Sequence, residues 1–91
     1  MTTQIIDVRE TDEFKKGHVD KSLNIPLDNI REDFFETTGI QKDTVLIIYC
    51  RSGNRSEQAI SILKSLGYQH LINGINQQIT KRIILRQSKP L

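Results

Sequence analysis

Short apolar runs alternate along the chain with stretches whose apolar residues recur at helical spacing. Apolar runs at 4–8, 23–25, 45–49 and 70–72 predict four short strands. The segments 11–16, 28–37, 59–66 and 76–86 predict helices between and after these strands. The alternation is typical of an α/β domain, here a small parallel sheet of about four to five strands flanked by helices.

The run from Val45 to Tyr49 is the strongest strand signal in the sequence. Its five consecutive apolar residues predict a strand that is covered on both faces, at the centre of a parallel sheet. Cys50 follows directly at its C-terminal end. A polar loop over 51–55 then leads into the predicted helix 59–66, and Gly67 stands where that helix should end.

Turn and capping residues suggest where the two earlier helices begin and end. Thr11 is expected to cap the helix 11–16, and Gly17 to end it. Asp28 is expected to cap the helix 28–37, and Gly39 to close it. The residues expected to face the core from these segments are Phe14, Ile30, Phe34 and Phe35, and from the last helix Ile79, Ile83 and Ile84.

Length and composition narrow the class of protein. With 91 residues, 36% hydrophobic and 26% charged, the chain is expected to form a single domain over 1–91, and it is neither collagen-like nor disordered. No apolar run approaches the length of a membrane helix, and the first residues lack the pattern of a signal peptide. We therefore expect a soluble, cytoplasmic protein with no membrane partner.

The net charge of +2 comes from the C-terminal end. All 11 acidic residues and 9 of the 13 Lys and Arg residues lie within 1–80, whereas the end of the chain adds Lys81, Arg82, Arg86 and Lys89 with no acid. The body shows no basic face with interleaved aromatic residues, so nucleic acid is not an expected partner. The basic segment within 76–91 is either a solvated final helix or a surface that docks an acidic partner.

Cys50 is the only cysteine, so it can form no internal disulfide and offers no zinc site. Taken alone it could be a small buried hydrophobic residue or a reactive thiol. The next six residues favour the second reading. They are Arg51, Ser52, Gly53, Asn54, Arg55 and Ser56.

Three features of this segment point to anion chemistry. Ligands of open α/β sheets bind at the carboxyl ends of the strands, which is where Cys50 stands. The loop leads into a helix N-terminus, whose free N–H groups and positive dipole end favour an anion. Arg51 and Arg55 bracket the loop, and Gly53 allows a turn that brings successive N–H groups inward. We expect Cys50 to be a nucleophilic thiolate within an anion-binding cradle, with Arg55 orienting the loop or its ligand.

The chain carries two separated motifs. The first comprises Ile6–Glu10, Glu13-Phe14, Gly17-His18 and Asn24–Pro26, and the second is Tyr49–Ser56; Gly67-Tyr68 and Asn73-Gly74 follow. In order and spacing these motifs resemble those of the single-domain rhodaneses, the sulfurtransferases that carry sulfur as a cysteine persulfide. The resemblance covers about residues 5–74. It departs from the family near the last turn, where Gly74-Ile75 replaces the common Gly-Gly and no Trp is present.

The resemblance implies that Cys50 accepts sulfur and that the amides of Arg51 to Ser56 hold the outer sulfur of the persulfide. Arg51 and Arg55 would favour an anionic donor such as thiosulfate. The acceptor would be external, either cyanide, a thiol or a partner protein, and neither a cofactor nor a metal would be required. Asp7 and Arg9 are expected to pair or to cap nearby backbone, and His18 to be structural rather than a catalytic base.

Other functions remain open at this point. Phosphatase and arsenate-reductase loops place five residues between Cys and Arg, whereas four separate Cys50 from Arg55, and no Asp suggests itself as a general acid. The tighter loop suits a single sulfur atom better than a tetrahedral oxyanion. A sulfur carrier or sensor without turnover and a non-catalytic binding module are the remaining alternatives.

Overall fold

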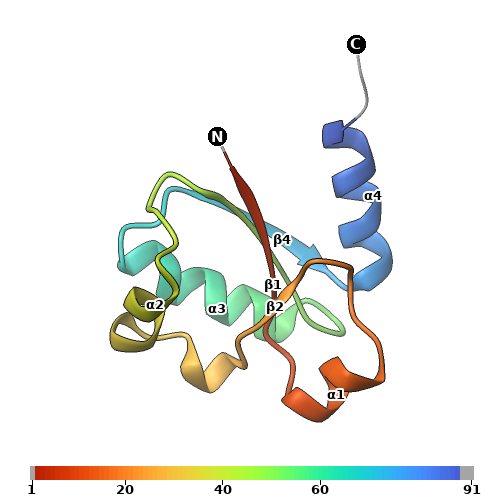
Figure 1. The fold of residues 1–91 in the computed structure, drawn as a ribbon, viewed down its shortest axis with the longest axis horizontal. Coiled ribbons are helices and arrows are strands. Elements are labelled where there is room, and N and C mark those ends of the chain that lie inside the picture. The colour runs from red at the N-terminus through yellow and green to blue at the C-terminus, as the bar shows by residue number, and fades with distance from the viewer. Residues whose placement is uncertain (1, 89–91) are drawn as a thin grey trace.

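A computed structural model describes residues 2–88, with four parallel strands in the order β2-β1-β3-β4 and helices on both sides of the sheet (Figure 1). The strands are β1 (Thr3–Asp7), β2 (Leu23–Asn24), β3 (Val45–Tyr49) and β4 (His70–Ile75). The helices are α1 (Thr11–Lys16), the 3₁₀ helix η1 (Leu27–Asn29), α2 (Glu32–Thr38), α3 (Asn54–Ser65) and α4 (Gln77–Ser88). The predicted α/β class and the small parallel sheet are confirmed, with four strands.

β3 is the buried centre of the sheet, as its apolar run predicts. It pairs with β1 on one side and β4 on the other, and Leu46, Ile47, Ile48 and Tyr49 have no exposed surface. α2 and α3 lie on one side of the sheet and α4 on the other (Figure 1). The main core cluster includes Ile6, Val8, Ile25, Ile30, Phe35, Leu46, Ile48, Ala59, Leu63 and Tyr68.

The predicted helix over 28–37 is wrong in its first part. Asp28 lies within η1 and caps no α-helix; α2 begins only at Glu32, after Ile30 and an extended Arg31. Ile30 is 3% exposed, so the chain turns there to bury this side chain in the core before a helix can start. The inward positions of Phe34 and Phe35 are confirmed.

Smaller differences occur at other element ends. Thr11 is the first residue of α1 rather than its cap, because Glu10 occupies the cap position and donates its N–H to the Glu13 carboxylate. α3 begins at Asn54, inside the predicted loop, and β4 continues to Ile75. The predicted helix ends at Gly17, Gly39 and Gly67 agree with the structure.

α4 is helical as predicted, and its start is locked to the end of β4. The buried Thr80 donates its hydroxyl to the carbonyl oxygen of Gly74 at 3.2 Å and its N–H to that of Asn76 at 3.0 Å. A Cβ at Gly74 would collide with the Thr80 hydroxyl, so this close approach needs glycine. Of the basic C-terminal residues, Lys81, Arg82 and Arg86 lie on α4, and Lys89 lies outside the described residues.

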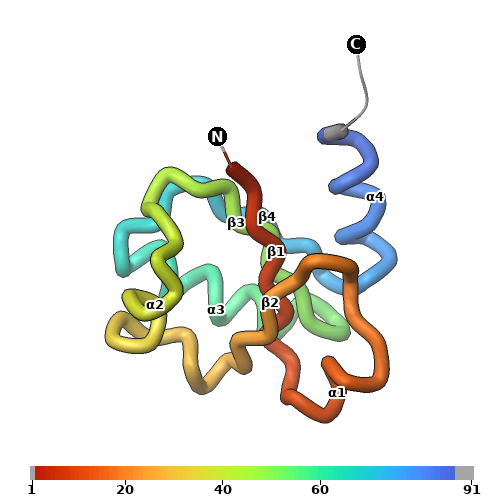
Figure 2. Tube along the Cα trace, viewed as in Figure 1, coloured from red at the N-terminus to blue at the C-terminus, as the bar shows by residue number. Residues whose placement is uncertain are grey.

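The strand order places the ends of β1 and β3 side by side (Figure 2). The chain moves outward in one direction from β1 to β2 and in the other from β3 to β4, so the topology changes direction between β1 and β3. Open α/β sheets bind ligands at the carboxyl ends of strands at such a switch point. Val8 and Arg9 follow β1, and Cys50 follows β3, so the candidate site lies there.

Candidate active site

Cys50 lies at the end of β3 beneath the loop that leads into α3. It is 1% exposed, and its backbone N–H donates to the carbonyl oxygen of Ile75 at 3.2 Å, which ties it to the end of β4. Its Sγ accepts a hydrogen bond from the N–H of Gly53 at 3.1 Å and lies 3.6 Å from the hydroxyl oxygen of Ser56. The thiol is therefore surrounded by polar hydrogen atoms of its own loop.

The pKa of Cys50 is lowered to about 7 from an ordinary value of 9.0. Burial acts in the opposite direction, since it disfavours the charged thiolate, but it is outweighed by the Ser56 hydroxyl and by the backbone N–H groups of Ser56, Ser52 and Gly53. The expected easily ionised thiol is thus supported by geometry. The lowering of the Cys50 pKa comes mainly from hydrogen bonds within the loop rather than from the charges of Arg51 and Arg55.

Gly53 supplies the turn that makes this arrangement possible. It precedes α3 with φ +95°, a left-handed conformation that favours glycine. The turn directs its N–H at the sulfur, and a Cβ there would contact the Ile75 side chain at 3.4 Å. A larger residue at position 53 would both strain the backbone and press against the wall of the site.

The two loop arginines have different partners. Arg55, in the first turn of α3, forms a bidentate ion pair with Glu13 of α1, with N···O distances of 2.7 and 3.1 Å. This pair raises the pKa of Arg55 and lowers that of Glu13 to about 2. Arg51 is exposed and forms no ion pair within residues 2–88. Arg55 is therefore fixed to α1, whereas Arg51 has no carboxylate partner among these residues.

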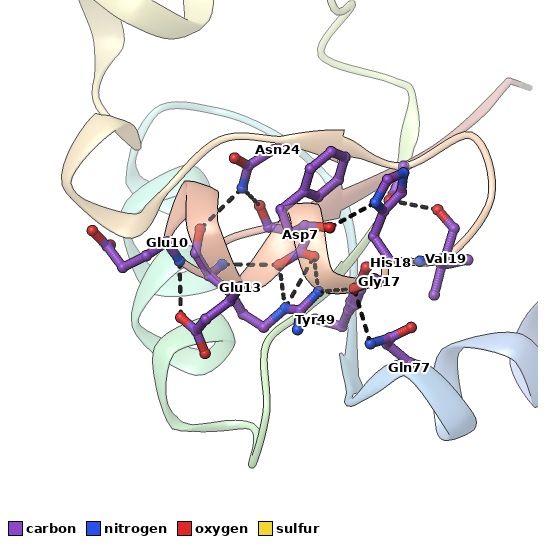
Figure 3. Close-up of polar contacts among 12 residues, drawn as sticks. Asp7, Glu10, Glu13, Gly17, His18, Val19, Asn24, Tyr49 and Gln77 are labelled. Atoms are coloured by element: carbon purple, nitrogen blue, oxygen red, sulfur yellow. Dashed lines mark hydrogen bonds and ion pairs between the residues drawn. The ribbon is translucent and has the colours of Figure 1, made fainter.

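The N-terminal motif forms a buried polar network beside the loop (Figure 3). Asp7 accepts hydrogen bonds from the backbone and guanidinium of Arg9, the shortest at 2.6 Å, and Arg9 donates onward to the carbonyl oxygen of Gly17 at 2.7 Å. Asn24 donates to the carbonyl oxygens of Asp7 and Arg9. The expected pairing of Asp7 with Arg9 is confirmed, and it joins the ends of β1, α1 and β2.

His18 has a structural setting. Its ring stacks on Phe14 with centroids 3.6 Å apart, and its Nδ1 lies 2.8 Å from the Phe14 carbonyl oxygen. Both contacts hold it against α1 (Figure 3). These contacts support a structural role for His18, and its exclusion as a catalytic base stays a prediction.

A cavity of about 240 Å³ opens above Cys50. Its walls come from the end of β1, the loop and the start of α4, and its lining residues are Arg9, Cys50, Arg51, Asn76, Gln77 and Gln78. Gln77 also donates to the Gly17 carbonyl oxygen at 3.2 Å, which joins the α4 side of the cavity to α1 (Figure 3). Two larger hollows lie between β1 and α4 and contain no residue of the loop 50–56. Among residues 2–88, no group of His, Cys, Asp or Glu side chains could hold a metal.

The loop residues that were predicted to bind the persulfide differ in whether they direct a hydrogen-bond donor toward the Cys50 thiol. Ser52, Gly53 and Ser56 turn donors toward Cys50, whereas Asn54 is exposed. Sequence reasoning did not assign Asn73 or Ile75 of β4 to the site, although Asn73 accepts a hydrogen bond from Ser56 and the Ile75 side chain lies against Gly53. The replacement of Gly-Gly by Gly74-Ile75 was the available signal, since it marks an altered wall at this place.

The first 77 residues match the model of the rhodanese-like domain. The chain belongs to the rhodanese-like family. A fission yeast (Schizosaccharomyces pombe) protein named "Putative thiosulfate sulfurtransferase, mitochondrial" is 42% identical over 82 residues, 79% of this chain and 58% of that protein. The thiosulfate sulfurtransferase PspE of Escherichia coli is 38% identical over 68 residues, 75% of this chain and 64% of that protein.

A solved structure described as a rhodanese with anions from E. coli superposes with a TM-score of 0.76 at 31% identity. The match covers 86% of this chain and 91% of that one. This chain spans less than two thirds of the length of the two curated relatives. No helix within residues 2–88 is long and apolar enough to cross a membrane. One relative is named mitochondrial, and the cytoplasmic location stays a prediction.

Proposed function

We propose that this rhodanese-like protein is a sulfurtransferase that moves sulfane sulfur from an anionic donor such as thiosulfate to a thiophilic acceptor through a persulfide on Cys50. The observation that carries the proposal is the set of loop N–H groups directed at the Cys50 sulfur beneath an open cavity. The kinship with proteins named as thiosulfate sulfurtransferases supports it.

The first half-reaction transfers sulfur to the protein. The Cys50 thiolate attacks the outer sulfur of thiosulfate, so that a new S–S bond forms while the S–S bond of the donor breaks and its electron pair leaves with sulfite. The persulfide carries one negative charge. The N–H groups of Ser52, Gly53 and Ser56 already turn toward the Cys50 sulfur and are available to stabilise this charge.

The second half-reaction returns the enzyme to its starting state. Cyanide, a thiolate or a partner protein attacks the outer sulfur, the S–S bond breaks, and its electron pair returns to Cys50 as the thiolate. Because Cys50 is the only cysteine, no second thiol of this chain can resolve the persulfide. The acceptor is therefore external, and the chemistry itself calls for no metal or cofactor.

Intact-mass measurement after incubation with thiosulfate tests the proposal directly. We expect wild-type protein to gain one sulfur atom and to lose it on addition of cyanide with release of thiocyanate, while Cys50→Ser gains nothing. Persulfide formation without transfer to cyanide or small thiols would indicate a sulfur carrier instead. No gain of sulfur, with Cys50 still open to alkylation, would contradict the proposal and favour another anion, tested next with phosphate esters and arsenate.

A further inference from the structure

Asn73, on β4, contacts the thiol-bearing loop through both atoms of its carboxamide. Its Oδ1 accepts from the Ser56 hydroxyl at 2.7 Å and from the N–H of Ile75 at 2.9 Å. Its Nδ2 donates to the carbonyl oxygen of Gly53 at 3.2 Å and to the Glu57 carboxylate at 3.1 Å. Each donor and acceptor of this amide has a partner, so its orientation is fixed.

Asn73 also fixes a strained backbone. Ile75 has φ +67°, a conformation that β-branched residues rarely adopt. Its N–H is held by Asn73 and its carbonyl oxygen accepts the N–H of Cys50. One side chain thus joins the end of β4, the turn at Gly53 and the hydroxyl nearest to the Cys50 sulfur.

The Ser56 hydroxyl has one proton and three acceptors within reach. Asn73 Oδ1 lies at 2.7 Å, the Gly53 carbonyl oxygen at 3.1 Å and Cys50 Sγ at 3.6 Å. While Cys50 is a thiol, its S–H can donate to Ser56 Oγ and Ser56 can donate to Asn73. A thiolate has no proton to give. Ser56 can then stabilise the sulfur only by turning its own proton away from Asn73.

We propose that Asn73 is a positioning residue for Cys50: it competes with the sulfur for the Ser56 proton and so limits how readily the thiolate forms. The inference rests on the proposed function in taking Cys50 as the reacting group. Alkylation of Cys50 by iodoacetamide tests it without any sulfur donor, so its failure is distinguishable from failure of sulfur transfer.

The test compares the pH at which the alkylation rate is half-maximal in wild type and in variants of Asn73 and Ser56. In wild type we expect this midpoint near pH 7. Asn73→Leu removes the competing acceptor and should lower the midpoint by about 0.5 pH units, whereas Asn73→Asp keeps the acceptor and adds negative charge and should raise it by about 1 unit. Ser56→Ala alone should raise it, because the thiolate loses a donor.

The decisive comparison is made in the Ser56→Ala background. There Asn73→Leu should leave the midpoint unchanged, and the rise caused by Asn73→Asp should fall to half or less, since only its charge still acts. A merely structural role would move both Asn73 variants in the same direction, toward the midpoint of a free thiol, with or without the Ser56 hydroxyl. That result would overturn the proposal.

The surrounding charges do not obscure the measurement. The charged groups near the loop are Arg9 after β1, Arg51, the Arg55–Glu13 pair and Glu57 on α3. Guanidinium groups titrate above the measured range of about pH 6–9, but Asn73→Asp would place a second carboxylate beside Glu57 and raise the pKa of one of the two, so the Asn73→Asp proteins also carry Glu57→Gln and are compared with Glu57→Gln alone. If Asn73→Leu fails to fold, as judged by circular dichroism, the Asn73→Asp shift with and without the Ser56 hydroxyl still decides: an equal shift in both backgrounds rejects the competition.

Discussion

Three guanidinium groups lie near Cys50, and their partners decide what each can do. Arg9 is neutralised by Asp7, and Arg55 by Glu13, whereas Arg51 is exposed at the rim of the cavity and has no carboxylate partner in the described part of the chain. We therefore expect a dianionic donor entering the cavity to meet Arg51 as its unpaired positive charge. On this view, the attraction of the loop for anions should depend on Arg51 more than on Arg55.

We predict that Arg51→Gln raises the KM for thiosulfate by about 5- to 20-fold with a smaller change in kcat, because it removes a charge-assisted contact made already in the bound donor. Steady-state kinetics with cyanide as acceptor measures this. Arg31→Gln, which alters an exposed arginine bonded to Asp33, is the matched control and should leave the KM unchanged. An unchanged KM in Arg51→Gln would show that the donor does not use this side chain.

At the scale of elements, the Glu13–Arg55 pair joins two helices that are distant in sequence. β2, η1, α2 and β3 lie between α1 and the loop, yet the Glu13 carboxylate of α1 holds Arg55 in the first turn of α3. The two side chains are 28% and 31% exposed, so the pair is partly shielded from water. We expect it to stabilise the folded protein as well as the loop.

The pH dependence of this contribution follows from the pKa of Glu13, which falls from 4.5 to about 2 on folding. A lowered carboxylate pKa stabilises the folded state above about pH 4.5, and this stabilisation disappears as the pH falls toward 2. Glu13→Gln should therefore lower the free energy of unfolding by about 1–2 kcal/mol at pH 7 and by progressively less in acid, after allowance for solvent screening. Urea denaturation at a series of pH values measures the difference.

Asp12→Asn is the control for that experiment. Asp12 lies in the same first turn of α1 and is exposed, so its substitution changes the helix charge without touching Arg55. Asp12→Asn should change the free energy of unfolding by no more than about 0.5 kcal/mol. A loss in Glu13→Gln that did not shrink in acid would mean that the carboxylate acts through something other than its charge.

Helices and strands were predictable from the sequence wherever the local spacing of apolar residues matches their burial in the fold. The apolar run of β3 and the helical spacing of α3 and α4 identified these elements, and the glycines marked helix ends. The start of α2 was not predictable, because the burial of Ile30 is a tertiary event that interrupts a pattern otherwise suited to helix from Asp28.

The candidate site, too, combines features that local sequence reveals with features that depend on contacts between distant residues. The segment from Cys50 to Ser56 is contiguous, so its chemistry could be recognised from sequence. The partners that position it are remote: Glu13 is 42 residues from Arg55, and Asn73 is 17 residues from Ser56. Only the crossover of the chain between strands brings them together. The sequence therefore predicted both the loop N–H groups and the arginines as causes of a lowered Cys50 pKa, but not that Arg55 is paired with a remote carboxylate.

At the scale of the whole molecule, burial is concentrated around β3. Its residues 46–49 have no exposed surface and its backbone is paired on both sides, whereas β2 is a two-residue edge strand and α1 has no buried residue. Local opening should therefore be unequal across the fold. The end of β3, which bears Cys50, stands on the most protected part of the molecule.

We predict that the backbone amides of Ile47 and Ile48 exchange with deuterium only through global unfolding. The amides of α1 should exchange through local opening, which requires less free energy. Native-state hydrogen exchange, measured at several urea concentrations below the unfolding transition, distinguishes the two routes of exchange. The free energy of global unfolding falls steeply with urea concentration, whereas that of local opening changes little. Equal protection of α1 and β3 would contradict this and would mean that the Asp7–Arg9 network makes the first helix part of the same cooperative unit.

The depth of the Cys50 sulfur also bears on the regiochemistry of sulfur transfer. A persulfide offers two sulfur atoms to an incoming thiolate, and attack at the inner one would link the acceptor to Cys50 as a mixed disulfide and expel hydrosulfide. Because Cys50 is 1% exposed, we expect its own loop to screen the inner atom of the proposed persulfide and leave the added atom within reach of an acceptor. The same S–S bond breaks in either case, so we expect burial to decide which sulfur is attacked: the atom that came from the donor is then the atom passed to the acceptor.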